Sequence, residues 1–467
     1  MMGGKYQTYP RYKDSGVVWL GGVPENWTVT KIGYLSHKTG SGKTPKGGSE
    51  IYSDSGILFL RSQNVYDTGL LLNENDVVFI SEKIDEEMTG SRVLNGDILL
   101  NITGASIGRT CIVPEGFQPA NVNQHVCIIR TPSTLRKYLS LYLKSASTKA
   151  QIDAAQNGAA REGLNFEQLS NIAVCFPDNE LERDAIADFL DHETAKIDTL
   201  IEKQQQLIKL LKEKRQAVIS HAVTKGLNPN APMRNSGVEW LGEVPEHWVV
   251  LRLSRVGKIG QGCSFAHAIQ GQEAGELPWF KCMDMNSPGN DENMNKAANY
   301  VDYDLAEKIR APIFPAGTVI FPRVGAALLT NKRRILSRPS IVDDNIYTFT
   351  PTRIQSRFAY IFLQLIDMGA LCSPGLVPTI TFGAINNVRI PLPSFSEQQE
   401  IVDHVDSHVI KMETLIQKAE IMIGLMQERR TALISAAVTG KIDVRHFNPE
   451  DGESPEPSNT NNKEVAA

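Results

Sequence analysis

The segment that decides the fold is written twice: Ser15-Gly16-Val17-Val18-Trp19-Leu20-Gly21-Gly22-Val23-Pro24-Glu25-Asn26-Trp27 returns as Ser236-Gly237-Val238-Glu239-Trp240-Leu241-Gly242-Glu243-Val244-Pro245-Glu246-His247-Trp248. Ten of the thirteen positions are identical, at an offset of 221 residues. A second stretch, 182–223, returns without a gap as 397–438 at an offset of 215. Repetition on this scale indicates a duplicated unit, so we expect a pseudo-two-fold molecule and not an enzyme with one active site.

Length and composition fit two domains plus connectors. The chain has 467 residues, of which 41% are hydrophobic and 22% charged, and single domains usually stop growing at about 250–300 residues. No apolar run approaches the roughly 18 residues of a membrane span, and the first sixteen residues lack the features of a secretory signal. We therefore expect a cytoplasmic protein.

The repeated stretches near residues 200 and 415 have the spacing of long amphipathic helices. A 4-3 seam in the first copy holds seven apolar positions of eleven, and its equivalent in the second copy holds nine of eleven if Ala is counted. Neither stretch contains Pro. About 40 residues at ~1.5 Å each give a rod of roughly 60 Å, and two such helices should bury their apolar stripes against each other in an antiparallel pair. The alternative is that each helix packs only on its own domain.

Between each Trp-Leu-Gly motif and its helix lie about 150 residues rich in short apolar runs bounded by Gly, Pro, Asn and Asp, which is typical of β structure. Residues 97–102 and 318–321 follow Gly96 and Gly317, and Gly104 and Gly325 keep the same register. Residues 37–73, by contrast, have no recognisable counterpart in 258–295. The pattern predicts one scaffold that carries two different surfaces.

Motifs for catalysis are weak. Gly40-Ser41-Gly42-Lys43-Thr44 resembles the end of a phosphate-binding loop, but His37 stands where the motif requires Gly, and Pro and Gly follow where a helix should begin. The nine His and six Cys residues show no metal-ligand spacing. We expect no cofactor and no metal.

Charge is unevenly distributed. The net charge is −5, yet residues 308–357 hold nine Lys or Arg against two Asp, a local excess of seven positive charges. Such a patch favours contact with nucleic acid. The segment after Asn448 is acidic and rich in Pro, Ser and Asn, which predicts disorder.

A family resemblance rests on a set of motifs in a fixed order. They are Tyr12-Lys13-Asp14-Ser15-Gly16 with Trp19-Leu20-Gly21 and Pro24-Glu25-Asn26-Trp27, their second copy, Gly104-Ala105-Ser106-Ile107-Gly108-Arg109, Asn123-Gln124-His125, and Pro391-Leu392-Pro393 with Glu397-Gln398 and Ile401. Together they resemble the specificity subunit of type I restriction-modification systems. Glu182-Arg183 departs from the usual Glu-Gln, and Asp344-Asn345-Ile346 stands where the first copy has Asn123-Gln124-His125.

The resemblance implies an α+β fold in which two β-rich target-recognition domains, related by a pseudo-two-fold, are separated by a pair of long antiparallel helices. The expected boundaries are 1–180 and 226–395 for the recognition domains, 181–225 and 396–443 for the spacer helices, and 444–467 for the acidic tail. It also implies double-stranded DNA, two methyltransferase subunits and restriction or translocase subunits as partners. Catalysis would belong to those partners, and the chain itself carries no methylation, S-adenosylmethionine or helicase motif.

Residues that contact DNA are expected in polar loops, because Arg, Lys, Asn and Gln read base edges while a large share of contacts goes to phosphates. In the first domain the candidates are Arg61, Ser62, Asn64, Thr103, Ser106, Arg109, Asn123, Gln124, His125 and Arg161. In the second they are Lys281, Asp284, Arg323, Asn331, Lys332, Arg333, Arg334 and Asn345. A solvated loop or a phosphate contact is the alternative for each of them.

Two other classes of function were weighed. A scaffolding protein that uses its helices only for oligomerisation would have two near-identical domains, and the divergence of the middle segments argues against it. A phosphate-loop ATPase would bind nucleotide, which a thermal-shift assay would detect.

Overall fold

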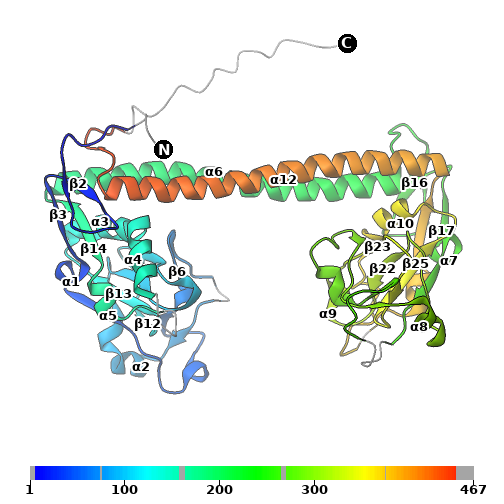
Figure 1. Cartoon of the computed structure of the whole chain (residues 1–467), viewed down its shortest axis with the longest axis horizontal. Coiled ribbons are helices and arrows are strands. Elements are labelled where there is room, and N and C mark those ends of the chain that lie inside the picture. Colours follow the sequence, from blue (N-terminus) through cyan, green and yellow to red (C-terminus); the bar gives the residue numbers. More distant parts are fainter. Residues whose placement is uncertain (1–5, 74–75, 157–162, 265–269, 374, 449–467) are drawn as a thin grey trace, which may run out of the picture. The chain divides into compact units, whose positions relative to one another are not determined.

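The computed structural model describes residues 6–73, 76–156, 163–264, 270–373 and 375–448. The chain forms two compact units: unit 1 comprises 1–204 and 420–467, and unit 2 comprises 205–419. Each unit combines short strands with small helices and with parts of two long helices, α6 (Glu180–Lys225) and α12 (Phe395–Val438) (Figure 1). The tail predicted to be disordered lies, from residue 449 onward, outside the described residues.

Unit 1 contains two small four-stranded sheets. In one the order is β11-β10-β13-β4 and all neighbours are antiparallel; in the other it is β8-β5-β12-β9, with β12 and β5 parallel. Three further strand pairs are β1-β2, β3-β14 and β6-β7. The strands are β1 (Tyr12–Asp14), β2 (Gly22–Pro24), β3 (Trp27–Lys31), β4 (Lys38–Ser41), β5 (Ile57–Leu60), β6 (Val65–Tyr66), β7 (Gly69–Leu70), β8 (Phe79–Ile80), β9 (Arg92–Val93), β10 (Ile98–Asn101), β11 (Thr110–Ile112), β12 (Ala120–Val122), β13 (Val126–Arg130) and β14 (Ala173–Pro177). The short helices are α1 (Ile32–Leu35), α2 (Glu82–Glu87), α3 (Ser133–Leu143), α4 (Ala146–Gln156) and α5 (Phe166–Ser170).

Unit 2 repeats this plan. Its larger sheet has the order β18-β25-β22-β23-β20, and a second sheet, β21-β19-β24, contains the parallel pair β19-β24 that corresponds to β5-β12. The strands are β15 (Met233–Asn235), β16 (Glu243–Pro245), β17 (Val249–Arg252), β18 (Gly257–Gln261), β19 (Leu277–Phe280), β20 (Asn293–Met294), β21 (Tyr300–Val301), β22 (Val319–Pro322), β23 (Arg334–Leu336), β24 (Ile341–Val342), β25 (Ile346–Pro351) and β26 (Arg389–Leu392). The short helices are α7 (Leu253–Val256), α8 (Tyr303–Lys308), α9 (Ala326–Leu329), α10 (Ser356–Leu363) and α11 (Phe382–Asn386).

The two long helices pair in an antiparallel sense within each unit. In unit 1 the core holds Ile186 and Leu190, near the start of α6, together with Leu433 and Val438, near the end of α12. In unit 2 the end of α6 and the start of α12 share the core in the same way. The predicted fold class, an α+β chain with two related β-rich units and a pair of long antiparallel helices, is therefore confirmed.

One ion pair is present in both copies of the helix pair. Arg430 Nε lies 2.9 Å from Asp198 Oδ1 in unit 1, and Arg215 Nη1 lies 3.3 Å from Glu413 Oε1 in unit 2. The offset of 215 residues relates Asp198 to Glu413 and Arg215 to Arg430. The repeated sequence therefore specifies the same register in both units.

The predicted seam is buried only in part. Ile197 is buried, but the next seam position, Leu200, and its equivalent Leu415 are 46% and 49% exposed. Leu207 and its equivalent Met422 are 42% and 44% exposed. The expectation that the two stripes cover each other along their whole length is corrected, because these middle positions face outward.

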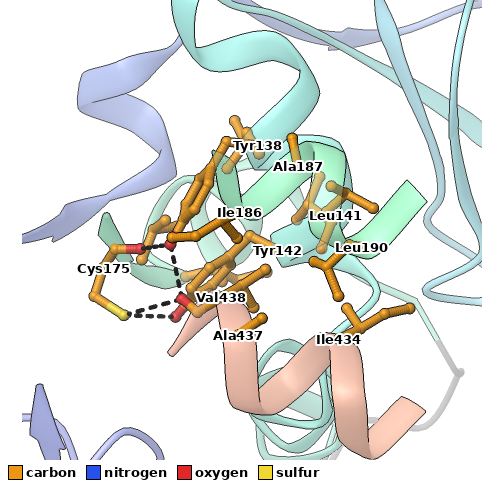
Figure 2. Close-up of a cluster of buried hydrophobic side chains, with 14 of the residues drawn as sticks. Tyr138, Leu141, Tyr142, Cys175, Ile186, Ala187, Leu190, Ile434, Ala437 and Val438 are labelled. Carbon is orange, nitrogen blue, oxygen red and sulfur yellow. Dashed lines mark hydrogen bonds between the residues drawn. The ribbon is translucent and has the colours of Figure 1, made fainter. Parts of the chain in front are cut away.

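In unit 1 the helix pair closes over an aromatic core (Figure 2). The hydroxyl of Tyr138 donates to the carbonyls of Cys175 (3.0 Å) and Val438 (2.8 Å), which joins α3, β14 and α12. Tyr142 lies beside it, fully buried. Burial raises the pKa of the Cys175 thiol to about 12, so this cysteine is a neutral core group.

The repeated Trp at the end of each Trp-Leu-Gly motif anchors a long helix. Trp27 Nε1 donates to Glu182 Oε1 at 3.0 Å, and Trp248 Nε1 donates to Glu397 Oε1 at 2.9 Å. Both indoles are 1% exposed, so each burial is accompanied by a charge-assisted hydrogen bond. The two conserved-looking motifs are thus the two halves of one structural contact.

The departure at Arg183 has a structural explanation. In unit 2, Gln398 donates to the carbonyl of Pro393 at 3.0 Å and accepts from the backbone of Gln355 at 2.9 Å. In unit 1, Arg183 donates to the carbonyls of Asp178 (3.0 Å) and Thr134 (3.3 Å), which occupy the equivalent places. Arg therefore joins the same segments as Gln does.

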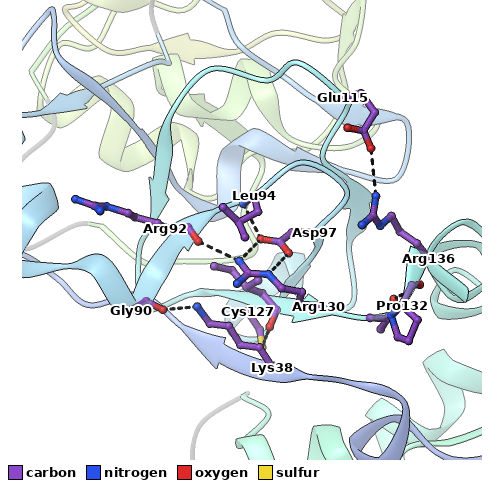
Figure 3. A network of polar contacts seen from close by, with 12 residues as sticks. Lys38, Gly90, Arg92, Leu94, Asp97, Glu115, Cys127, Arg130, Pro132 and Arg136 are labelled. Atoms are coloured by element: carbon purple, nitrogen blue, oxygen red, sulfur yellow. Dashed lines mark hydrogen bonds and ion pairs between the residues drawn. The ribbon is translucent and has the colours of Figure 1, made fainter. Parts of the chain in front are cut away.

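A polar network supports the start of β10 (Figure 3). Asp97 is 1% exposed and accepts two hydrogen bonds of 2.7 Å from the Arg130 guanidinium and one from the backbone of Leu94. Burial, with Arg130 close by, lowers the pKa of Lys38, whose ammonium donates to the carbonyl of Gly90. All of these groups have partners, which indicates that this network stabilises the sheet.

Candidate nucleic-acid interface

In unit 1 the candidate loops meet where β5, β10 and β12 end. Asn101, the last residue of β10, donates from Nδ2 to the carbonyl of Ser62 (2.8 Å) and to Ser106 Oγ (3.1 Å). The backbone of Asn123 donates to the carbonyl of Leu60 at 3.0 Å. The structure thus brings together loops that are 20–60 residues apart in sequence.

Residues 123–126 form a β-turn, which we name the tip turn of unit 1. The backbone of Val126 donates to the carbonyl of Asn123 (3.3 Å), and Asn123 Oδ1 accepts from the backbone of His125 (3.0 Å). Asn123 is buried, whereas Gln124 at the tip is exposed. The His125 ring bonds to Thr103 Oγ1 at 2.5 Å and to Gln124 Nε2 at 2.9 Å.

Two other candidates in unit 1 have their polar groups occupied by the fold. Asn64 is 1% exposed; its side chain accepts from the backbone of Arg61 and donates to the carbonyl of Leu71. Arg61 donates to the carbonyl of Asp76 at 2.8 Å. Arg109 is half-buried, and its guanidinium lies 4.8 Å from the centre of the Tyr66 ring. Arg161 lies outside the described residues.

Gly42 brings the end of β4 against the tip turn. Its backbone donates to the carbonyl of Asn123 at 3.1 Å, and a Cβ atom there would lie 1.5 Å from the carbonyl oxygen of Val122. The Gly-Ser-Gly stretch is therefore a strand end that needs Gly for close approach. It places the exposed Lys43 and Thr44 next to the tip turn.

Unit 2 contains the equivalent tip turn at residues 343–346. The backbone of Ile346 donates to the carbonyl of Asp343 (3.2 Å), and Asp343 Oδ1 accepts from the backbone of Asn345 (3.1 Å). The backbone of Asp343 in turn donates to the carbonyl of Phe280, as Asn123 does to Leu60. The offset here is 220, so the register inferred from the sequence was one residue out: Asn123-Gln124-His125 corresponds to Asp343-Asp344-Asn345.

The environment of the second tip turn is strongly polar. Arg323 Nε donates to the carbonyl of Asp344 at 2.6 Å, and its guanidinium lies 5.5 Å from the centre of the Tyr347 ring. Burial raises the pKa of Asp343 to about 6, which the nearby Asp344 reinforces. Asn345 is exposed.

Lys281 and Asp284 form the counterpart of the Arg61–Asn64 turn, although the sequence showed no match. Asp284 is 3% exposed and accepts from the backbone of Lys281 at 2.7 Å. Lys281 Nζ donates to Gln270 Oε1 at 2.9 Å. Asp284, like Asn64, holds the turn together.

The basic residues that follow α9 are less available than their charge suggested. Arg333 is 2% exposed, and its guanidinium donates to the carbonyls of Asn331 and Ile366. Burial lowers its pKa to about 10. Arg334 donates to the carbonyls of Asn290 and Met285, and Lys332 donates to Asn286. Asn331 is exposed with a φ of 55°, a left-handed conformation that Asn tolerates.

Sequence reasoning overlooked Lys43 and Asp344. Lys43 was set aside together with the phosphate-loop motif, and Asp344 was treated only as a departure from the family pattern. A basic residue after a strand-end Gly was the available signal for Lys43. Asp344 had none, because the one-residue change of offset is visible only in the backbone hydrogen bonds. Within the described residues no group of His, Cys, Asp and Glu is placed to hold a metal ion.

A family model, described as the type I restriction modification DNA specificity domain, matches residues 24–210 and again 245–421. The chain belongs to this family. It is the specificity subunit of a type I restriction-modification system, a DNA-recognition component that is not itself an enzyme. The two matches coincide with the duplication seen in the sequence.

Individual relatives agree with this assignment. The type I restriction enzyme MjaVIII specificity subunit of Methanocaldococcus jannaschii is 22% identical over 437 residues, covering 91% of this chain and 95% of the relative. A chain from a structure described as the structural basis of complex assembly and conformational transition of the type I R-M system has a TM-score of 0.67 at 15% identity, covering 89% of this chain and 98% of that one. The HsdS subunit from Thermoanaerobacter tengcongensis has a TM-score of 0.48 at 14% identity, covering 90% and 98%.

Proposed function

We propose that this specificity subunit reads a bipartite DNA site, one half-site with each recognition domain. The recognition domains are residues 1–180 and 226–395, and the spacer helices are 181–225 and 396–443, with the acidic tail at 444–467. The observation that carries the proposal is the pair of tip turns. They have the same backbone hydrogen bonds but present Gln124 and His125 in one unit and Asp344 and Asn345 in the other. One scaffold with two different polar tips suits two different half-sites.

The same subunit recruits two methyltransferase subunits, and through them restriction or translocase subunits. Support comes from apolar side chains that are exposed at equivalent places on both long helices: Leu200 and Leu415, Leu207 and Met422, and Leu210 and Leu425. Apolar surface that recurs at equivalent positions in a repeated structure fits a partner that binds twice.

The isolated subunit is expected to have no methyltransferase, nuclease or ATPase activity, and to be poorly soluble without the partners that cover these side chains. The site of action is the cytoplasm, where the DNA is. No helix within the described residues is long and apolar enough to cross a membrane.

The two alternative functions are less well supported. A scaffold has no need for two different tip turns. An ATPase would need Gly40–Thr44 to cradle a phosphate, but Lys38–Ser41 are paired with β13 and Gly42 lies against Val122.

Sequencing of methylated bases in cells that carry this subunit with its methyltransferase partner tests the proposal. The expected result is a motif of two short, different half-sites in inverted orientation, separated by bases that are not specified. A single uninterrupted motif would exclude it.

A further inference from the structure

We propose that the tip turn is the base-reading element of each unit, and that Gln124 reads adenine in one half-site while Asp344 reads cytosine in the other. This inference rests on the proposed function and names the chemistry of its recognition site.

The backbone of the tip turn is fixed in both units, so its side chains project from a rigid support. Asn123 and Asp343 are buried and hold the turn by accepting a backbone hydrogen bond. Gly42 and Gly262 pack against it so closely that a Cβ would lie 1.5 Å and 2.0 Å from the carbonyl oxygens of Val122 and Val342. A rigid support is what sequence readout needs, because the geometry of a base-edge contact decides its selectivity.

In unit 1 the hydrogen bonds orient the Gln124 carboxamide. Its Nε2 lies 2.9 Å from His125 Nε2. An amide nitrogen only donates, so His125 Nε2 accepts, and the proton sits on Nδ1, which donates to Thr103 Oγ1 at 2.5 Å. Gln124 keeps its Oε1 and one N–H for a ligand. One acceptor beside one donor matches the N6 amino group and N7 of adenine in the major groove.

In unit 2 the same position is a carboxylate. Asp344 Oδ1 accepts from Asn345 Nδ2 and Oδ2 accepts from Ser264 Oγ, both at 3.3 Å. A carboxylate is repelled by phosphates, so on DNA its favourable partners are exocyclic amino groups. Cytosine offers its N4 amino group in the major groove without the neighbouring N7 acceptor that adenine presents. Asp344 therefore favours cytosine.

The neighbouring side chains divide the work in the same way in both units. Lys43 follows Gly42 beside the first turn, and Arg323 touches the second through the carbonyl of Asp344. These cations supply contacts to phosphates, which position the turn without specifying a base. The buried Asn64, Asp284 and Arg333 are excluded as readers.

Reciprocal substitutions in the complete complex with its methyltransferase subunits test the assignment. Gln124→Glu replaces the amide by an acceptor-only group, and Asp344→Asn does the reverse. We expect Gln124→Glu to change one position of one half-site from adenine to cytosine, and Asp344→Asn to change one position of the other half-site from cytosine to adenine. Each preference should change by about 5- to 150-fold, the range for one base contact.

The matched control is Gln118→Glu, the same chemical change at an exposed residue that precedes β12, whereas the tip turn follows that strand. Methylome sequencing should show its motif unchanged. Where a variant methylates too little to define a motif, binding of the purified complex to duplexes with each base at the affected position replaces that measurement. Cytosine preference in Gln124→Glu then supports the assignment, and equal affinity overturns it.

Unchanged half-sites in both tip-turn variants, with the wild-type motif still bipartite, would overturn the inference and leave the proposed function standing. The same shift in Gln118→Glu would also overturn it, because charge alone would then be the cause. A wild-type complex that methylates without a bipartite motif would defeat the proposed function itself.

Discussion

Replacing Arg333 should cost folding stability and leave the electrostatics of DNA binding unchanged. Its guanidinium donates to the carbonyls of Asn331 and Ile366 inside unit 2. In Arg333→Ala both carbonyls lose their partner, at about 1–3 kcal/mol each, and the packing of a large buried side chain is lost as well. We expect a decrease of about 3–5 kcal/mol in the free energy of unfolding of this unit.

Lys332→Ala is the matched control, since Lys332 is adjacent and only half-buried. Its cost should stay within about 1 kcal/mol. Thermal unfolding of the complex measures both variants, at about 2–4 °C per kcal/mol for a unit of this size.

Salt dependence separates a structural role from a DNA contact. A lost phosphate contact lowers the slope of log affinity against log salt by about 0.9. We expect Arg333→Ala to retain the wild-type slope at a temperature where it is folded. A slope reduced by about one, with unchanged thermal stability, would refute the structural role and return Arg333 to the DNA interface.

Three further outcomes follow from the geometry. Gly42→Ala should unfold unit 1 at lower temperature, because the added methyl would collide with the Val122 carbonyl at 1.5 Å; thermal stability equal to wild type would contradict this. The pKa of Asp343 is raised to about 6, so its protonated form is favoured in the folded state and unit 2 should lose stability as pH rises from about 4 through 6; Asp343→Asn, which copies unit 1, should flatten this dependence in denaturant titrations at several pH values, and an unchanged dependence would exclude Asp343 as its source. Inserting one heptad after Gln206 and one after Ile421 should lengthen the unread spacer by up to about 3 base pairs, because each helix grows by roughly 10 Å; an active complex with an unchanged spacer in its methylome would refute the ruler role.

The duplication and the long helices could be predicted from the sequence because both leave a periodic signal. The Trp-Leu-Gly motif, the Glu that its Trp contacts and the 215-residue offset of the helices are all local and repeated. The extent of helix burial could not be predicted in the same way. Leu200 and Leu415 fit the seam, yet they are exposed, because apolar spacing does not say whether another helix or a partner subunit covers a position.

The candidate site was only partly predictable. The tip turns were found as polar loops, but their register depends on backbone hydrogen bonds that the sequence does not display. Arg333 looked like part of a basic patch because charge implies exposure. Its burial follows from two backbone carbonyls, Asn331 and Ile366, of which one is distant in the chain. Base-reading roles remain predictions.

The central claim is that two recognition units of one subunit read two different half-sites. Sequencing the methylated bases of cells that carry the wild-type subunit with its methyltransferase partner tests it most directly. The account predicts one motif with two short, dissimilar half-sites in inverted orientation around a spacer of fixed length. A contiguous motif, two identical half-sites, or methylation without sequence preference would contradict it.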